Sequence, residues 1–270
     1  MPLLFDALRP RCALPDFPNL TSLHIFDSEL NQSSESECRE MSLVVVPFIL
    51  HVHEKIKTLT WEHSMAEEVT KHITASHLPN LETFSGCSIR YLVRSHPLKR
   101  LELLYIRPQD IFNRTTGSSL LRETSSCSPG LSVLSVRPCI RTKALLSDLR
   151  TFTGLTELWY NEAPGVESDD DESWDERLYA LDVVRKVVPI LHKLRSLCIT
   201  IHMDAMGTLL CDDDFDILRC MRTRSLLILT FQFVIESEQY IRYDVHRQKP
   251  KGRWKIRSFD GAHGMRKFIL

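Results

Sequence analysis

Five side chains suited to contacting another macromolecule occur in short segments where apolar and polar residues alternate. They are Arg100, Glu102, Arg137, Glu157 and Trp159. Such alternation is typical of a strand with one buried face, so these residues are expected to share the exposed face. Because Trp and Arg dominate the energetics of many interfaces, we predict that this face binds a protein. The alternative is an ordinary solvated strand face whose Trp is covered by residues 162–176.

Signatures of catalysis are missing from the sequence. There is no glycine-rich phosphate loop, no G-x-S-x-G or H-E-x-x-H motif, and no recognisable catalytic cysteine. The 8 cysteines include no C-x-x-C pair and follow neither zinc nor disulfide spacing. We therefore predict a non-catalytic protein without a cofactor.

A group of histidines is the nearest approach to a metal-binding pattern. His51 and His53 would share one face of a strand, and His63, His72 and His77 follow. No cysteine or carboxylate completes a ligand spacing typical of zinc. We interpret them as ordinary surface or helix-end histidines and expect no metal site.

An acidic segment at residues 162–176 contains Ser168 followed by three aspartates. Acidophilic kinases favour this composition, so Ser168 is a candidate phosphosite, where phosphate would add negative charge to an already acidic segment. The alternative is a loop that only increases solubility. Its low hydrophobicity and high charge predict a mobile insert.

The C-terminal segment, residues 236–270, differs in charge, with nine basic residues against four acidic ones. Two alternating stretches, 240–245 and 253–259, flank Pro250-Lys251-Gly252, which predicts a β-hairpin. One interpretation is a cap over the apolar end of the preceding structure. The other is a nucleic-acid-binding segment with Trp254 as a stacking surface. The composition favours the cap.

The elements that position these residues come from one repeated pattern. An apolar residue, two variable residues, an apolar residue, one variable residue and a third apolar residue recur about eight times. The repeats begin at Leu20, Ile56, Leu81, Leu98, Leu131, Leu155, Leu194 and Leu226. The segment Leu155-Thr156-Glu157-Leu158-Trp159-Tyr160 shows the pattern most clearly, while Gly86 replaces the third apolar residue in the repeat at Leu81.

Helix-like segments lie between the strand patterns. They are residues 65–78, 140–152 and 175–194, and Pro or Gly often precedes the next strand. A strand followed by a helix, repeated, produces parallel strands whose apolar sides are buried by stacking. We predict an α/β solenoid over residues 1–235, with parallel strands on one face, helices on the other, and 236–270 as its cap.

With this pattern the chain resembles leucine-rich repeat proteins, and its Pro-Asn-Leu-x-x-Leu strings and acidic inserts resemble the repeat region of fungal-type F-box proteins. The resemblance implies substrate recognition for a ubiquitin ligase. The string closest to an F-box opening is Leu14-Pro15-Asp16-Phe17-Pro18, where Pro18 would disrupt the required helix. We therefore expect no F-box in this chain, and no docking to the ligase adaptor. The module would have been lost or would lie outside the printed sequence.

Composition limits the remaining possibilities. The net charge of −1 predicts no general attraction to nucleic acid or anionic lipid. The longest apolar run, 43–50, contains Pro47 and is far shorter than a membrane span of about 20 residues. No signal peptide is apparent, so we expect an intracellular protein, cytoplasmic or nuclear, with reduced thiols and no membrane partner.

Overall fold

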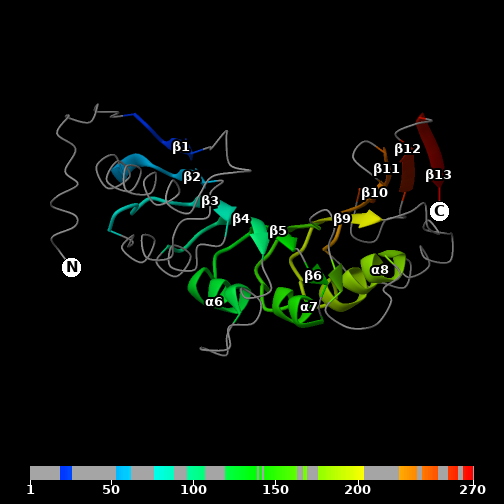
Figure 1. Ribbon diagram of the computed structural model, residues 1–270, viewed down its shortest axis with the longest axis horizontal. Helices are drawn as coiled ribbons and strands as arrows, with labels where there is room; N and C mark the ends of the chain where they lie inside the picture. The colour runs from blue at the N-terminus through cyan, green and yellow to red at the C-terminus, as the bar shows by residue number, and fades with distance from the viewer. Residues whose placement is uncertain are drawn as a thin grey trace.

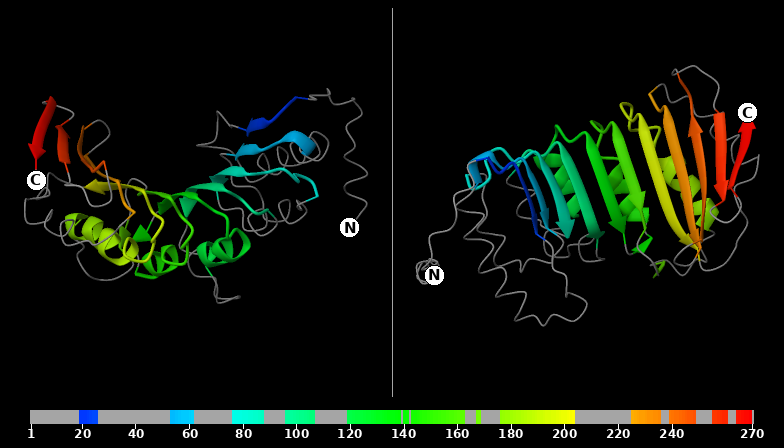
Figure 2. Two further views of the ribbon diagram at one scale, coloured as in Figure 1. Left: turned by 180° about the vertical axis from the view of Figure 1, so that it is seen from behind. Right: turned by 90° about the horizontal axis from the view of Figure 1, so that it is seen from above.

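The computed structural model describes the strand core of the chain and three of its helices. The described residues are 19–25, 53–61, 76–87, 96–106, 119–138, 140–141, 143–162, 167–168, 176–203, 225–235, 239–248, 255–260 and 264–269. They form one 11-stranded open sheet and one 2-stranded sheet. The described helices lie on one side of the large sheet, which bends so that its other side is concave (Figures 1 and 2).

The large sheet begins with eight parallel strands that are neighbours in the order of the chain. They are β1 (Ser22–Ile25), β2 (Thr58–Trp61), β3 (Thr83–Cys87), β4 (Arg100–Ile106), β5 (Val133–Pro138), β7 (Glu157–Asn161), β9 (Ser196–Met203) and β10 (Ile228–Ile235). Each corresponds to one of the eight sequence repeats. The α/β class and the parallel strands predicted from the sequence are therefore confirmed.

Three antiparallel strands complete the large sheet. They are β11 (Gln239–His246), β12 (Lys255–Asp260) and β13 (Gly264–Ile269). The pairing of β11 with β12 is the predicted hairpin, and β13 extends it by a strand that the sequence analysis did not foresee. Because β11 pairs with β10 along its whole length, these three strands continue the sheet.

A backbone ladder at the start of the strands shows how regular the repeats are. The residue after each repeat's first apolar residue donates its N–H to the carbonyl of the equivalent residue in the preceding repeat, at 2.8–2.9 Å. The ladder runs through residues 21, 57, 82, 99, 132, 156, 195 and 227 and ends with Arg247 on Leu227. The strand starts therefore stay in register although the segments between the strands differ in length.

The core lies between the sheet and the helices. Each strand contributes its alternate residues, such as Leu158 and Tyr160 of β7, both 0% exposed. The hydroxyls of Tyr160 and Tyr179 are 2.6 Å apart, which ties the sheet to α8 (Glu176–Val187). Gly86 of β3 takes an inward position where a larger residue would not fit. A Cβ there would collide with the carbonyl oxygen of Trp61 and lie 2.5 Å from the Phe84 ring.

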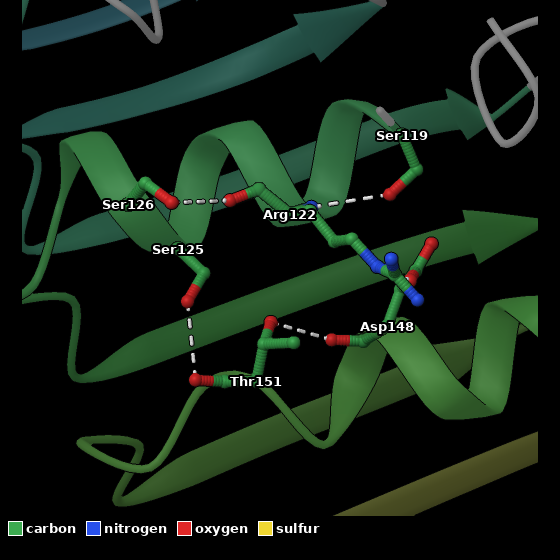
Figure 3. A network of polar contacts seen from close by, with 6 residues as sticks. All are labelled: Ser119, Arg122, Ser125, Ser126, Asp148 and Thr151. Atoms are coloured by element: carbon green, nitrogen blue, oxygen red, sulfur yellow. Dashed lines mark hydrogen bonds and ion pairs between the residues drawn. The ribbon is translucent and has the colours of Figure 1, made fainter. Parts of the chain in front are cut away.

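Neighbouring helices are joined by a polar network between α6 (Leu120–Cys127) and α7 (Lys143–Leu149) (Figure 3). The Ser119 hydroxyl caps α6 by accepting a hydrogen bond from the Arg122 N–H at 3.2 Å. The Arg122 guanidinium donates to the buried carboxylate of Asp148 at 2.5 Å. The Thr151 hydroxyl donates to the Asp148 carbonyl, and the Ser125 hydroxyl to the Thr151 carbonyl.

The helices differ in part from those expected. The expected helix over 140–152 begins instead as strand β6 (Ile140–Arg141), and α7 covers its middle. Helix α6 was not predicted, and α8 covers the first two-thirds of the expected helix over 175–194. Most of the expected helix over 65–78 lies outside the described residues, which begin there at 76.

The described residues of the acidic insert, 162 and 167–168, differ from the mobile loop that the sequence predicts. Glu162 is 1% exposed, and β8 (Glu167–Ser168) pairs in parallel with β6. The local acidic composition did not predict this pairing, because it depends on a partner strand more than 25 residues earlier in the chain.

Candidate protein-binding face

All five predicted contact residues come from β4, β5 and β7, which lie side by side at the centre of the sheet. In the strand register, Arg100 is opposite Val133 and Val133 is opposite Glu157. Two positions further along, Glu102, Ser135 and Trp159 form the next row. Alternation along each strand directs these rows away from the buried residues, towards the concave side (Figure 2). The sequence therefore placed the five residues on one common face.

Trp159 is the most distinctive residue of this concave face. It is 40% exposed, although a large aromatic side chain gains about 25 cal/mol for each Å² of apolar surface that it buries. Its indole N–H donates a hydrogen bond to the Glu157 carboxylate on the same strand. The ring is thereby oriented within the face while part of its surface stays open to solvent. The alternative that residues 162–176 cover Trp159 stays a prediction, because residues 163–166 and 169–175 lie outside the described ranges.

The concave face continues into the C-terminal strands. The Thr230 hydroxyl of β10 donates to the Asp244 carboxylate of β11 at 3.0 Å, and the Arg242 guanidinium donates to the same oxygen at 2.9 Å. Arg257 lies opposite Asp244 in the β11–β12 register, and Lys255 lies opposite His246. Directly opposed residues of an antiparallel pair point to the same side, so the basic residues of β11 and β12 join this face.

Cys198 lies beside Trp159 in the register of β7 and β9. Burial raises the pKa of its thiol, while the nearby Arg242 guanidinium opposes that shift. A thiol with a raised pKa carries little thiolate at neutral pH and is a poor nucleophile. Cys198 is therefore a packed member of the face rather than an activated cysteine.

A cavity of about 190 Å³ opens at the carboxyl-terminal side of the same strands. Its lining is mostly polar and comes from β4, β5, β7 and β9. The lining residues are Glu102, Leu103, Leu104, Ser135, Arg137, Asn161, Glu162, Thr200 and His202. Two of the five predicted residues, Glu102 and Arg137, thus line a common cavity, while the other three belong to the adjoining open face.

The cavity coincides with a break in strand pairing. Leu103 pairs with Val136, but the next pair is Ile106 with Pro138, so two residues of β4 face Arg137 alone. On its other side, β5 is registered with β7 only as far as Val136 and Tyr160. Such bulges re-aim side chains and are frequent next to functional sites. Arg137 therefore lies beside the bulge of β4 and one residue beyond the last pair that β5 forms with β7.

Sequence reasoning missed four polar residues of the cavity: Asn161, Glu162, Thr200 and His202. Asn161 and Thr200 lie two residues beyond the outward positions Trp159 and Cys198. Following the same alternation for one more outward position on each strand would have found them. The Thr200 hydroxyl donates to the Asn161 side-chain oxygen at 2.8 Å. Nothing local signals Glu162, because its N–H pairs with the Thr200 carbonyl of a strand almost forty residues later.

The other candidate sites have different outcomes. Ser168 lies in β8 opposite Arg141, and its phosphorylation stays a prediction. His51, His63, His72 and Trp254 lie outside the described residues. Within the described ranges, no three His, Cys, Asp or Glu side chains gather as metal ligands.

Comparisons with known proteins add no relative to these observations. No protein-family model matches the chain, and a search of curated proteins also finds no match. None of the helices in the described part of the chain has the length and apolar character needed to cross a membrane.

Proposed function

We propose that this chain is a leucine-rich-repeat-type scaffold that binds a partner protein through its concave strand face. The observation that carries the proposal is Trp159, 40% exposed at the centre of the sheet. Exposed Arg100 and Arg137 and half-buried Glu102 and Glu157 lie on the same face of β4, β5 and β7. An aromatic anchor ringed by polar groups is the usual composition of a protein-binding hot spot.

The repeat architecture supports this proposal. Eight parallel strands stacked in chain order, with a continuous ladder at their starts, form an extended curved surface of the kind that solenoid proteins use for binding. Catalysis by a cysteine needs a thiol with a lowered pKa. Burial instead raises the pKa of Cys198, the described cysteine of this face whose pKa is shifted, which disfavours the reactive thiolate. Binding therefore explains the concave face better than catalysis.

The test compares partners captured by three proteins expressed in cells: the unchanged chain, Trp159→Ala, and Arg185→Ala as a control on exposed α8 surface. Quantitative mass spectrometry after mild cross-linking should show partners that Trp159→Ala loses at least tenfold and Arg185→Ala keeps. The proposal fails if Trp159→Ala retains the same partners at the same level while its melting temperature is unchanged.

The resemblance to F-box proteins suggests a more specific role. We infer that the captured partner is a protein whose turnover depends on a ubiquitin ligase. Deleting this chain from cells should then lengthen the partner's half-life in a chase experiment. An unchanged half-life would leave the scaffold but remove its link to degradation.

Nucleic-acid binding is the second candidate function. Lys255 and Arg257 are exposed in β12, and phosphate contacts use such residues. However, Arg242 already forms an ion pair with Asp244, and Arg257 lies opposite that carboxylate. The observations therefore favour a protein partner, and absence of filter retention of single-stranded DNA and RNA at low salt would remove this candidate.

A further inference from the structure

We propose that the concave face from β7 to β12 binds an extended segment of the partner protein with apolar side chains at one end and acidic side chains at the other. This inference rests on the proposed function and names the kind of partner that the face fits. Two observations carry it. Exposed apolar side chains lie on β7 and β10, and an excess of positive charge lies on β11 and β12 of the same face.

Trp159 and Ile228 supply the apolar contacts. Among the described residues, they are the two large hydrophobic side chains on the exposed surface, at 40% and 49% exposure. Trp159 is opposite Cys198 in the strand register, and Cys198 is opposite Thr230. Ile228 lies two residues before Thr230 and therefore on the same side of β10. Both apolar surfaces thus face the concave side, where a partner that covered them would remove them from water.

Positive charge gathers at the C-terminal end of the same face. Arg242 of β11 and Lys255 and Arg257 of β12 are exposed, and the half-buried Asp244 lies among them. The Asp244 carboxylate already accepts hydrogen bonds from the Arg242 guanidinium and the Thr230 hydroxyl. Within the described part of the chain, Lys255 and Arg257 have no ion-pair partner. Three basic side chains against one carboxylate leave a net charge of +2, which carboxylates of a partner would complement.

The spacing of the strands sets the length of the segment. The order across this part of the sheet is β7, β9, β10, β11 and β12 (Figure 2). Four spacings of about 4.8 Å give a path of about 19 Å, which an extended chain crosses in about six residues. A first apolar residue over Trp159 is then followed by a second about three positions later, beside Ile228. Acidic residues about four and six positions from the first reach β11 and β12.

The distribution of charge along this path favours a peptide over a nucleic acid. A nucleic acid carries a negative charge at every nucleotide and would need cations along the whole path. The outward residues of β9 and β10 include no Asp, Glu, Lys or Arg, and Glu157 next to Trp159 is itself acidic. A peptide can confine its acidic residues to one end, which matches a face whose cations lie only on β11 and β12.

The test is fluorescence anisotropy of labelled synthetic peptides with the full chain. The probes are the nonapeptide Gly-Phe-Ser-Ser-Leu-Glu-Ser-Glu-Gly and its reversed sequence, because a segment can cross the strands in either direction. At least one of the two should bind saturably. Replacing both glutamates by glutamine, or Phe and Leu by serine, should weaken binding at least about fivefold. Raising NaCl from about 50 to about 300 mM should weaken the glutamate peptide and leave the glutamine peptide unchanged.

Variants of the protein locate the binding surface. Lys255→Gln combined with Arg257→Gln should weaken the nonapeptide about fivefold, and Ile228→Thr about threefold. These side chains are exposed, so thermal melts should show each variant folded. Arg185→Gln is the matched control, because it removes the same charge from the exposed surface of α8 and should leave binding unchanged.

Three results would overturn the inference. They are no saturable binding in either direction, equal affinity for the glutamate and glutamine peptides, and tighter binding of oligothymidylate than of the nonapeptide. The last result would assign the basic strands to nucleic acid. Failure here leaves the scaffold proposal intact, since that is tested separately by Trp159→Ala and captured partners.

Discussion

At the scale of single residues, Trp159 and Tyr160 show how alternation divides binding from stability. They are neighbours in β7, yet Trp159 is 40% exposed while Tyr160 is 0% exposed and in contact with Tyr179. Each strand residue turns its side chain to the opposite side from the one before it. The two largest side chains of β7 therefore lie on opposite sides of the sheet, which leaves Trp159 for the proposed role in partner binding and Tyr160 for the core.

Substitution of the two aromatic residues should separate these roles. Trp159→Ala should cost about 1–2 kcal/mol of unfolding free energy, because 40% of the residue is already exposed and truncation removes only partly buried surface. Tyr160→Ala should cost about 3–5 kcal/mol, because it leaves a cavity and removes the hydrogen bond between the Tyr160 and Tyr179 hydroxyls. Urea denaturation measures both. Comparable losses would show that Trp159 is part of the core.

The Cys198 thiol provides a pH-dependent test of the same face. Its pKa is raised by burial, so the thiol stays protonated to higher pH than a solvated cysteine. The midpoint of its alkylation rate against pH, followed by mass spectrometry of the labelled peptide, should lie above that of a reference peptide. Arg242→Gln should raise the midpoint further, because it removes the positive charge that lowers this pKa.

The raised pKa also sets the sign of the pH effect on stability. The unfolded thiol ionises before the folded one, so Cys198 should reduce stability only as the pH rises above the ordinary thiol range. Cys198→Ser should flatten that alkaline loss. A midpoint at or below that of the reference peptide would contradict the burial of the thiol beside Trp159.

At the scale of elements, the ion pair between Arg122 and Asp148 joins two successive helices of the convex side. The Asp148 side chain is 5% exposed and that of Arg122 is 55% exposed. A buried carboxylate depends on its partner, because without one it would be charged in a poorly solvated site. The pair therefore fixes α6 against α7 (Figure 3).

Removing only the arginine should lower the stability of the protein more than removing both charges. Arg122→Ala should destabilise the protein by about 1–3 kcal/mol, because it leaves the Asp148 carboxylate unpaired. Arg122→Ala combined with Asp148→Asn should recover part of that loss. Lys186→Ala is the control, since its pair with Asp182 within α8 is exposed and worth less than about 0.5 kcal/mol. Additive effects in thermal denaturation would show that the two side chains act independently.

At the scale of the whole molecule, the last parallel strand depends on the C-terminal hairpin. Strand β11 covers the edge of β10 and buries Ile241, Tyr243 and Val245. Phe233 packs edge-on against Tyr243, with ring centroids 6.3 Å apart. An open edge at β10, with its apolar neighbours, would promote aggregation, and β11 covers that edge.

Two truncations should distinguish a cap from an independent segment. Deleting residues 236–270 should expose β10 and cause aggregation or loss of cooperative unfolding. Deleting only residues 249–270 keeps β11 and the bond from the Arg247 guanidinium to the Leu226 carbonyl, at 2.7 Å, and should leave a folded monomer. Size-exclusion chromatography and thermal melts provide the readout. A stable monomer after the longer deletion would contradict the capping role.

The amino-acid sequence alone determined where the eight parallel strands lie and which side of each of them is buried. Both follow from local physics: a period of two places Leu158 and Tyr160 on one side and Glu157 and Trp159 on the other. The C-terminal hairpin was equally predictable, since its strands and turn are adjacent in the chain.

Only the tertiary structure decided which segments of the chain lie next to these faces. The bulge of β4 beside Arg137 and the pairing of the Glu162 N–H with the Thr200 carbonyl each join segments far apart in the sequence. Pairing and packing between distant segments leave no local pattern, because they are set by which strand each segment finds as its neighbour. The cavity could therefore be found only after the strands had been assembled.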